Sequence, residues 1–254
     1  MIRKMINFRV WFIYLMLLPA YALTNTDKTE KITLNATQDT SIIILPKDQM
    51  KHQLKNYSAG GKPSLVCSDI GSMFFVAFDT FEIFEELKIL NPKQIVSVEI
   101  SLYCLQPESK TPQQIIARRV LLPWKEGKQK FSSADKNDLT FNSCLHQSLT
   151  WNKPPAQAML KEIDGDHPSD YNGSEDISHR IDALVKIEGS EQRYIWKGNL
   201  ITSAFQFWLI NPDYNYGHLF ALRDGSEKVK FASREHPNPK FHPTLTIFYK
   251  KKLG

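Results

Sequence analysis

Apolar side chains alternate with polar ones along residues 96–104, and this period constrains the fold more than any other feature of the sequence. Val96, Val98, Ile100, Leu102 and Cys104 occupy every second position. Successive side chains of a strand point to opposite faces, so the pattern predicts a strand with one packed face. Further strands are expected from short apolar runs at residues 42–45, 64–67, 73–78, 205–209, 229–233 and 244–249.

Clusters of Pro, Gly, Asn and Asp separate these runs, as is typical of an antiparallel β-sandwich. Two segments instead carry apolar residues at helical spacing, and we expect each to form a short helix. The first ends at Asn91-Pro92, where proline stops a helix. The apolar positions are Phe81, Phe84, Leu87 and Leu90 in the first segment, and Ile177, Ile181, Leu184 and Val185 in the second.

The sequence shows no internal repeat and no Pro- or Ser/Gly-rich linker that would divide it. We therefore expect one domain over residues 32–250, preceded by a polar lead-in at residues 23–31. Residues 105–115, 125–148 and 160–175 are polar and are expected to form loops.

Residues 1–22 have the pattern of a signal peptide. Arg3, Lys4 and Arg9 precede an apolar run from Val10 to Ala22, which ends in Ala20-Tyr21-Ala22. As a helix this run spans about 20 Å, less than the ~30 Å hydrocarbon core of a bilayer, which disfavours a retained membrane anchor. A buried amphipathic first helix is the alternative. We expect a protein that is secreted, extracellular or displayed at the cell surface.

The charge balance disfavours nucleic acid as a partner. The chain has 32 basic and 27 acidic residues, a net charge of +5. Three of the basic residues lie in residues 1–22, which hold no acid, so the remainder carries +2. Phosphate binding needs a concentrated cationic surface. The terminal Lys250-Lys251-Lys252 is either a solvated tail or a local attraction for an anionic glycan.

The three cysteines, Cys67, Cys104 and Cys144, permit one disulfide and leave an odd thiol. Cys104 lies on the apolar side of its strand, where a small buried side chain fits as well as a bridge. The sequence has no Cys-x-x-Cys pair, so we expect no structural zinc.

Asp164, Asp166 and Asp170 are the local candidates for calcium ligands. A solvated acidic loop is the simpler interpretation of this spacing. We therefore expect no metal and no cofactor, with a structural calcium, to which Asp39 would contribute, as the alternative.

No sequence motif indicates catalysis. Gly-x-Ser-x-Gly, His-Glu-x-x-His and glycine-rich phosphate loops are absent, and the seven histidines are scattered. Arg234-Glu235 resembles a catalytic pair, but adjacent residues of a strand face opposite ways, so we interpret both as residues that support the fold, each satisfying a different loop. A polysaccharide lyase is the less favoured alternative.

The loop at residues 211–218 is the richest candidate for a binding site. Exposed rings beside amide and carboxylate groups suit sugars, whose C–H faces are apolar and whose edges carry hydroxyls. Tyr214, Asn215, Tyr216 and His218 are the candidate ligand-binding residues here, and Tyr171 is a second candidate. The alternative is that Tyr214 and Tyr216 fold back and pack within the loop.

Several motifs, taken in order, resemble the DNRLRE-type domain, which is similar to carbohydrate-binding module family 96. The resemblance covers nearly all of the chain after residue 22, and its most specific part is the pair Thr-Trp-Asn-x-Pro and Phe-Ala-Ser-Arg-Glu. The matching segments are residues 36–40, 56–57, 65–66, 78–79, 96–103, 124–127, 149–155, 231–235 and 243–246.

This resemblance implies a jelly-roll β-sandwich of secreted and cell-surface proteins, in a family that includes binders of acidic polysaccharides such as alginate. We therefore expect a non-catalytic module that binds an extracellular polysaccharide, acidic ones included. A structural or adhesive module that binds a protein partner is the alternative.

Overall fold

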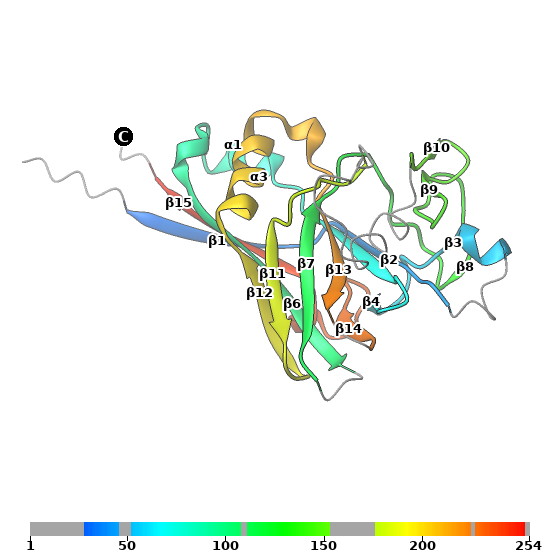
Figure 1. The fold of residues 1–254 in the computed structure, drawn as a ribbon. Helices are drawn as coiled ribbons and strands as arrows, with labels where there is room; N and C mark the ends of the chain where they lie inside the picture. Colours follow the sequence, from blue (N-terminus) through cyan, green and yellow to red (C-terminus); the bar gives the residue numbers. More distant parts are fainter. Residues whose placement is uncertain (1–27, 46–51, 108–110, 153–175, 225–226, 252–254) are drawn as a thin grey trace, which may run out of the picture.

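The computed structural model describes residues 28–45, 52–107, 111–152, 176–224 and 227–251. These residues form two antiparallel β-sheets that pack face to face (Figure 1). The β-sandwich expected from the sequence is confirmed. Among the described helices, none is long and apolar enough to cross a membrane.

The first sheet is built around the long strand β6. Strand β12 pairs with one edge of β6, while β15 and β14 pair with successive parts of the other edge. Strand β1 then pairs with β15, and β4 pairs with β14. The bounds are β1 Thr29–Asn35, β4 Ser64–Cys67, β6 Ile95–Pro107, β12 Gln192–Lys197, β14 Val229–Ala232 and β15 Thr244–Lys250.

The second sheet has the order β11-β7-β13-β5-β2. Its strands are β2 Gln38–Ile42, β5 Met73–Ala77, β7 Gln113–Arg119, β11 Ala183–Ile187 and β13 His218–Asp224. Two small two-stranded sheets lie beside the sandwich: β3 Tyr57–Ser58 with β8 Ser132–Ser133, and β9 Ser143–Leu145 with β10 Leu149–Thr150.

Eight of these strands have jelly-roll order. The first sheet contains the row β4-β14-β6-β12, and the second contains β5-β13-β7-β11. The chain crosses between the sheets at each step from β4 to β7, and again at each step from β11 to β14. Such crossings leave two sheets whose inner faces share one core.

The helices and 3-10 turns lie at the ends of the sheets. Two described α-helices are α1 Phe81–Glu86 and α3 Asn199–Ile210 (Figure 1). The 3-10 turns are η1 His52–Asn56, η2 Pro92–Gln94, η3 Pro212–Tyr214 and η4 Pro239–Phe241.

The core between the sheets follows the alternation of β6. Val98, Ile100, Leu102 and Cys104 are fully buried there, whereas Val96 is exposed. The strands expected at residues 64–67, 73–78, 229–233 and 244–249 are also confirmed, within a residue at their ends. The strand expected at 42–45 instead occupies Gln38–Ile42, and β1 begins at Thr29, within the expected lead-in.

Residues 205–209 form part of helix α3, so the strand expected there is wrong. The buried residues of α3 are Ile201, Thr202, Ala204, Phe205 and Trp208, which is the spacing of one helical face. Phe207, two positions after the buried Phe205 and one before the buried Trp208, is 45% exposed. The apolar-polar alternation within these five residues is a coincidence of a short window.

The second expected helix, at residues 177–185, is also wrong. Ile177 forms an isolated bridge with Val120, and residues 183–187 are strand β11. Leu184 is exposed, whereas Ala183 and Ile187 are buried. The first expected helix is present but ends at Glu86, with Phe84 buried and Phe81 and Leu90 exposed.

A second apolar layer covers the outer face of the second sheet. Side chains of β5 and β13 that point away from the inner core, such as Phe75 and Leu219, pack against Trp124, Leu139 and Trp151. Residues 125–148, expected as a polar loop, therefore contribute Leu139 and Cys144 to an apolar core. Cys67, Cys104 and Cys144 are all buried free thiols, which settles the disulfide question left open by the sequence.

Candidate functional site

The loop proposed from the sequence lies between α3 and β13. Tyr214 is 59% exposed and its ring lies 6.1 Å from that of Phe207, centroid to centroid. Asn215 donates its side-chain N–H to the carbonyl of Phe78 at 2.9 Å, and its Oδ1 is buried without a partner. Tyr214 is therefore an accessible ring, and Asn215 is anchored beside it.

Tyr216 and His218 have different surroundings from Tyr214. Tyr216 is half-buried, packs against the outer apolar layer, and accepts a hydrogen bond at its carbonyl from the indole N–H of Trp124 at 2.8 Å. For Tyr216, the packing alternative considered from the sequence describes the structure better.

His218 is fully buried, so it is not a surface ligand as the sequence suggested. It is the first residue of β13 and points into the inner core beside Phe205 and Trp208. Its Nε2 lies 3.4 Å from the carboxylate of Asp182, which also contacts Arg119 Nε at 3.0 Å. Tyr171, Asp164, Asp166 and Asp170 lie outside the described residues.

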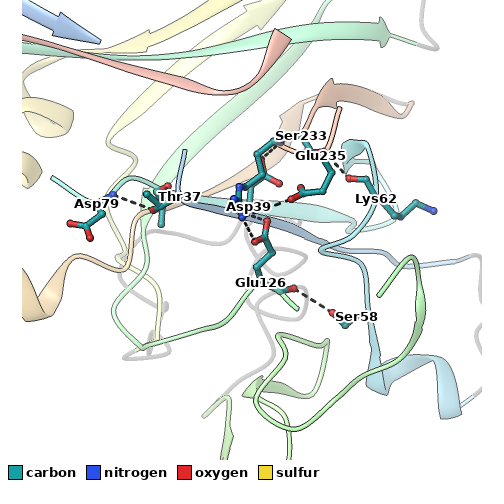
Figure 2. Close-up of polar contacts among 10 residues, drawn as sticks. Thr37, Asp39, Ser58, Lys62, Asp79, Glu126, Ser233 and Glu235 are labelled. Carbon is teal, nitrogen blue, oxygen red and sulfur yellow. Dashed lines mark hydrogen bonds and ion pairs between the residues drawn. The ribbon is translucent and has the colours of Figure 1, made fainter. Parts of the chain in front are cut away.

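A cleft of about 300 Å³ lies beside this loop, and we call it the aromatic cleft. Phe81, which is 49% exposed, is part of its wall, and Asn215 and Pro212 form another part. The polar wall is fixed by local hydrogen bonds, because Thr37 Oγ1 accepts from the backbone N–H of Asp79 at 3.2 Å (Figure 2). The full lining is Thr37, Gln38, Ala77, Phe78, Asp79, Thr80, Phe81, Pro212 and Asn215.

A group of three carboxyl groups, which we call the acidic cluster, lies nearby. Asp39, Glu126 and Glu235 each place one carboxylate oxygen within 4.8 Å of the others (Figure 2). Asp39 comes from β2, Glu126 from the loop after Trp124, and Glu235 from the turn after β14. Asp39 is fully buried, Glu126 is nearly so, and the side chain of Glu235 is 29% exposed.

Hydrogen bonds fix two of the three carboxylates. Asp39 N–H donates to Glu126 Oε1 at 3.0 Å, and Arg234 Nη1 lies 2.7 Å from Glu126 Oε2. Arg234 also donates its backbone N–H to Asp39 Oδ2 at 2.7 Å. Both oxygens of Glu126 and one oxygen of Asp39 are therefore engaged.

Two carboxylate oxygens in the cluster have no donor. Asp39 Oδ1 and Glu235 Oε2 are buried atoms without a hydrogen-bond partner. Glu235 is held by its backbone, whose N–H donates to Ser233 Oγ at 3.1 Å, and Ser233 in turn donates to the carbonyl of Lys62 at 2.7 Å. The turn after β14 thus presents Glu235 to Asp39.

The loop that carries Glu126 is held by a close backbone approach. A side chain at Gly60 would place Cβ 2.2 Å from the carbonyl oxygen of Glu126, so only glycine fits. Gly127 follows with a φ of +76°, a left-handed conformation that glycine adopts readily. Ser58 Oγ donates to the Glu126 carbonyl at 3.4 Å.

Burial raises the pKa of all three carboxyl groups. The pKa of Glu126 rises to about 7, because burial outweighs the hydrogen bond from the Asp39 N–H and the attraction of Arg234. Burial likewise raises the pKa of Asp39 well above its usual value, and it raises the pKa of Glu235. The neighbouring carboxylates raise the pKa of Asp39 and of Glu126 further, whereas a hydrogen bond with the side chain of Asp39 lowers the pKa of Glu235.

A larger cavity of about 860 Å³ opens onto the acidic cluster, and we call it the charged cavity. Gln38 lines both this cavity and the aromatic cleft, so the two hollows adjoin. The lining holds as many basic as acidic side chains, so the cavity has no large net charge. They are Lys125, Lys128, Lys136 and Arg234 against Glu126, Asp135, Asp138 and Glu235.

Spacing in the sequence did not reveal the acidic cluster, and strand alternation placed Arg234 and Glu235 on opposite faces. Strand β14 ends at Ala232, so strand alternation does not apply to the two residues that follow. Arg234 Nη1 lies 3.8 Å from Glu235 Oε1, and both side chains line the charged cavity. The interpretation that they serve different loops is wrong.

The signal that pointed to the cluster was the set of motifs itself. Asp39 lies in the segment 36–40, Glu126 in 124–127, and Arg234 and Glu235 in 231–235. These three segments are far apart in sequence and meet at one place in the fold (Figure 2).

The arrangement has three chemical uses: a shared proton between carboxyl groups, a bound cation, or acid–base catalysis on a ligand in the cavity. Glu126 has both oxygens occupied, which disfavours it as a general acid. No protein-family model and no curated protein sequence matches this chain.

Proposed function

We propose that this protein is a secreted, non-catalytic module that binds an extracellular polysaccharide at the aromatic cleft. The observation that carries the proposal is the pairing of exposed rings with fixed polar groups at and beside one hollow. Phe81 supplies a ring of the wall, and Tyr214 supplies an exposed ring in the loop whose residues Pro212 and Asn215 also line the cleft. Thr37, Asp79 and Asn215 supply the polar groups. Sugars are bound by such surfaces because rings stack on C–H faces while hydroxyls take the hydrogen bonds.

The charged cavity extends this surface beyond Gln38. A polysaccharide chain is longer than the aromatic cleft, and neighbouring sugar units would reach the lysine and carboxylate side chains of the larger hollow. Because those charges are balanced, the lining favours neutral and acidic glycans alike. The resemblance to polysaccharide-binding domains supports the same proposal.

Screening the chain from residue 23 on an array of neutral and acidic glycans tests the proposal. We expect saturable binding to at least one polysaccharide. Tyr214→Ala and Phe81→Ala should each weaken it by about two- to tenfold, the loss expected for one ring contact. Phe248→Ala, which removes a partly buried ring on the outer side of β15, is the matched control and should bind normally.

The outcome of the same screen also bears on catalysis. Chain cleavage, seen as new reducing ends or as ultraviolet absorbance of an unsaturated product, would contradict a non-catalytic module. A silent array would contradict glycan binding altogether.

The adhesive alternative has one observation in its favour. Helix α3 exposes Phe207 and Ile210, and Ile210 is 62% exposed. An exposed aliphatic side chain is better suited to contact a protein partner than a sugar. If the array is silent and Ile210→Ser abolishes binding to a purified surface partner, the chain is a protein-docking module.

A further inference from the structure

We propose that the acidic cluster of Asp39, Glu126 and Glu235 is a calcium site, filled from the charged cavity. The proposal does not depend on glycan binding. It starts from two buried carboxylate oxygens, Asp39 Oδ1 and Glu235 Oε2, which have no hydrogen-bond donor. A buried acceptor without a partner is costly, and two that converge are costlier because they repel.

The geometry gathers the three carboxylates around a common point. One oxygen from each of them lies within 4.8 Å of the other two, a spread that a single ion can bridge (Figure 2). Asp39 is fully buried, and its Oδ1 has no hydrogen-bond partner. The turn after β14 and the loop after Trp124 bring the other two oxygens to it.

The donor set selects the class of metal. The cluster contains carboxylate oxygens alone, without histidine or cysteine, and this composition suits hard cations. Calcium accepts six to eight oxygen ligands in irregular geometry. Glu126 and Glu235 line the charged cavity, so water and backbone oxygens can complete the shell there.

Arg234 sets the strength of the site. Its guanidinium lies 2.7 Å from Glu126 and 3.8 Å from Glu235, where it repels an incoming cation. We expect weak binding, with a Kd on the order of 10⁻⁴–10⁻³ M, as in extracellular calcium modules.

Titration of the purified chain with calcium, followed by calorimetry near neutral pH, tests the proposal. A second readout is terbium luminescence excited through tryptophan, because Trp124 lines the same cavity as Glu126. We expect one saturable site. Asp39→Asn and Glu235→Gln should each weaken calcium binding by about tenfold or more.

Two further variants separate calcium binding from a general effect on folding. Arg234→Gln should tighten calcium binding, a gain that a merely damaged fold would not give. Glu188→Gln changes an exposed carboxylate that directly follows β11 and is paired with Lys186, and it should leave binding unchanged. Circular dichroism checks that each variant is folded, and Glu235→Gln replaces Asp39→Asn if the latter does not fold.

Either of two results would overturn the proposal. The first is the absence of a saturable signal from the wild-type chain up to about 10 mM calcium, tenfold above the weak limit expected here. The second is calcium binding by both Asp39→Asn and Glu235→Gln that equals binding by the wild type. In both cases the converging oxygens share a proton, and the cluster is not a metal site.

Discussion

Arg234 supplies the positive charge that contacts the acidic cluster. Its guanidinium contacts Glu126 at 2.7 Å, and its backbone N–H contacts Asp39 at the same distance. Removing one partner of a partly buried ion pair leaves the other charge without compensation. The side chain of Arg234 is 38% exposed, so solvent screens part of this loss.

We predict that Arg234→Gln lowers the free energy of unfolding by about 1–2 kcal/mol in calcium-free buffer. Urea denaturation of the wild type and the variant measures the difference. Arg180→Gln, at an exposed arginine, is the control and should change stability by less than about 0.5 kcal/mol. Equal stability of the wild type and Arg234→Gln would show that the arginine does not balance the cluster.

His218 links folding to pH through its burial. Burial lowers the pKa of its imidazole, although the nearby carboxylate of Asp182 acts in the opposite direction and Arg119 adds to the lowering. The unfolded chain takes up a proton near the ordinary pKa of about 6.5, whereas the folded chain does so at lower pH. Stability from the neutral imidazole is therefore present above about pH 6.5 and is lost as the pH falls through the folded value.

We predict that the free energy of unfolding of the wild type falls between pH 7 and about pH 5.5. His218→Gln should be less stable at pH 7 and should show a shallower loss across this range. Urea titrations at several pH values provide the comparison. Parallel curves for the two proteins would contradict a buried neutral His218.

At the scale of elements, strands marked by alternation or by an uninterrupted apolar run were predictable, whereas strand β7 was not. Val98, Ile100 and Leu102 of β6 alternate because one face of that strand packs on the core. Strand β7 has apolar cores on both faces, with Ile115 in one and Ile116 in the other, so no alternation marks it. Apolar and polar residues alternate along a strand only where one face of the strand packs on the core and the other face meets water.

Helix α3 shows the opposite failure, a false alternation. Within residues 205–209 the apolar and polar side chains alternate, but across the whole helix the buried positions fall on one helical face.

The acidic cluster could not be derived from spacing, because Asp39 and Glu126 are 87 residues apart. Only the motifs of the family resemblance marked its members.

We predict that Phe205→Ala lowers the free energy of unfolding by about 3–5 kcal/mol, while Phe207→Ala costs less than about 1 kcal/mol. Phe205 is fully buried and Phe207 is 45% exposed. In a strand the two rings would share a face and would cost similar amounts. Denaturant unfolding of both variants distinguishes helix from strand, and comparable losses would contradict helix α3.

At the scale of the whole molecule, the second sheet ties two apolar layers together. Phe74 and Phe220 point into the inner core, while their neighbours Phe75 and Leu219 point into the outer layer. Unfolding of either apolar layer would expose to water one face of the strands that also support the other layer. We predict that tryptophan fluorescence and far-ultraviolet circular dichroism give the same urea midpoint. Two separate midpoints would contradict a single cooperative unit.

The central claim is that glycan binds at the aromatic cleft at one end of the sandwich. Hydrogen–deuterium exchange of the chain, with and without the glycan selected on the array, tests this claim most directly. We predict slower exchange at residues 78–82 and 211–217, with no change in β11 and β12. Protection confined to other strands, with these two segments unchanged, would contradict the account.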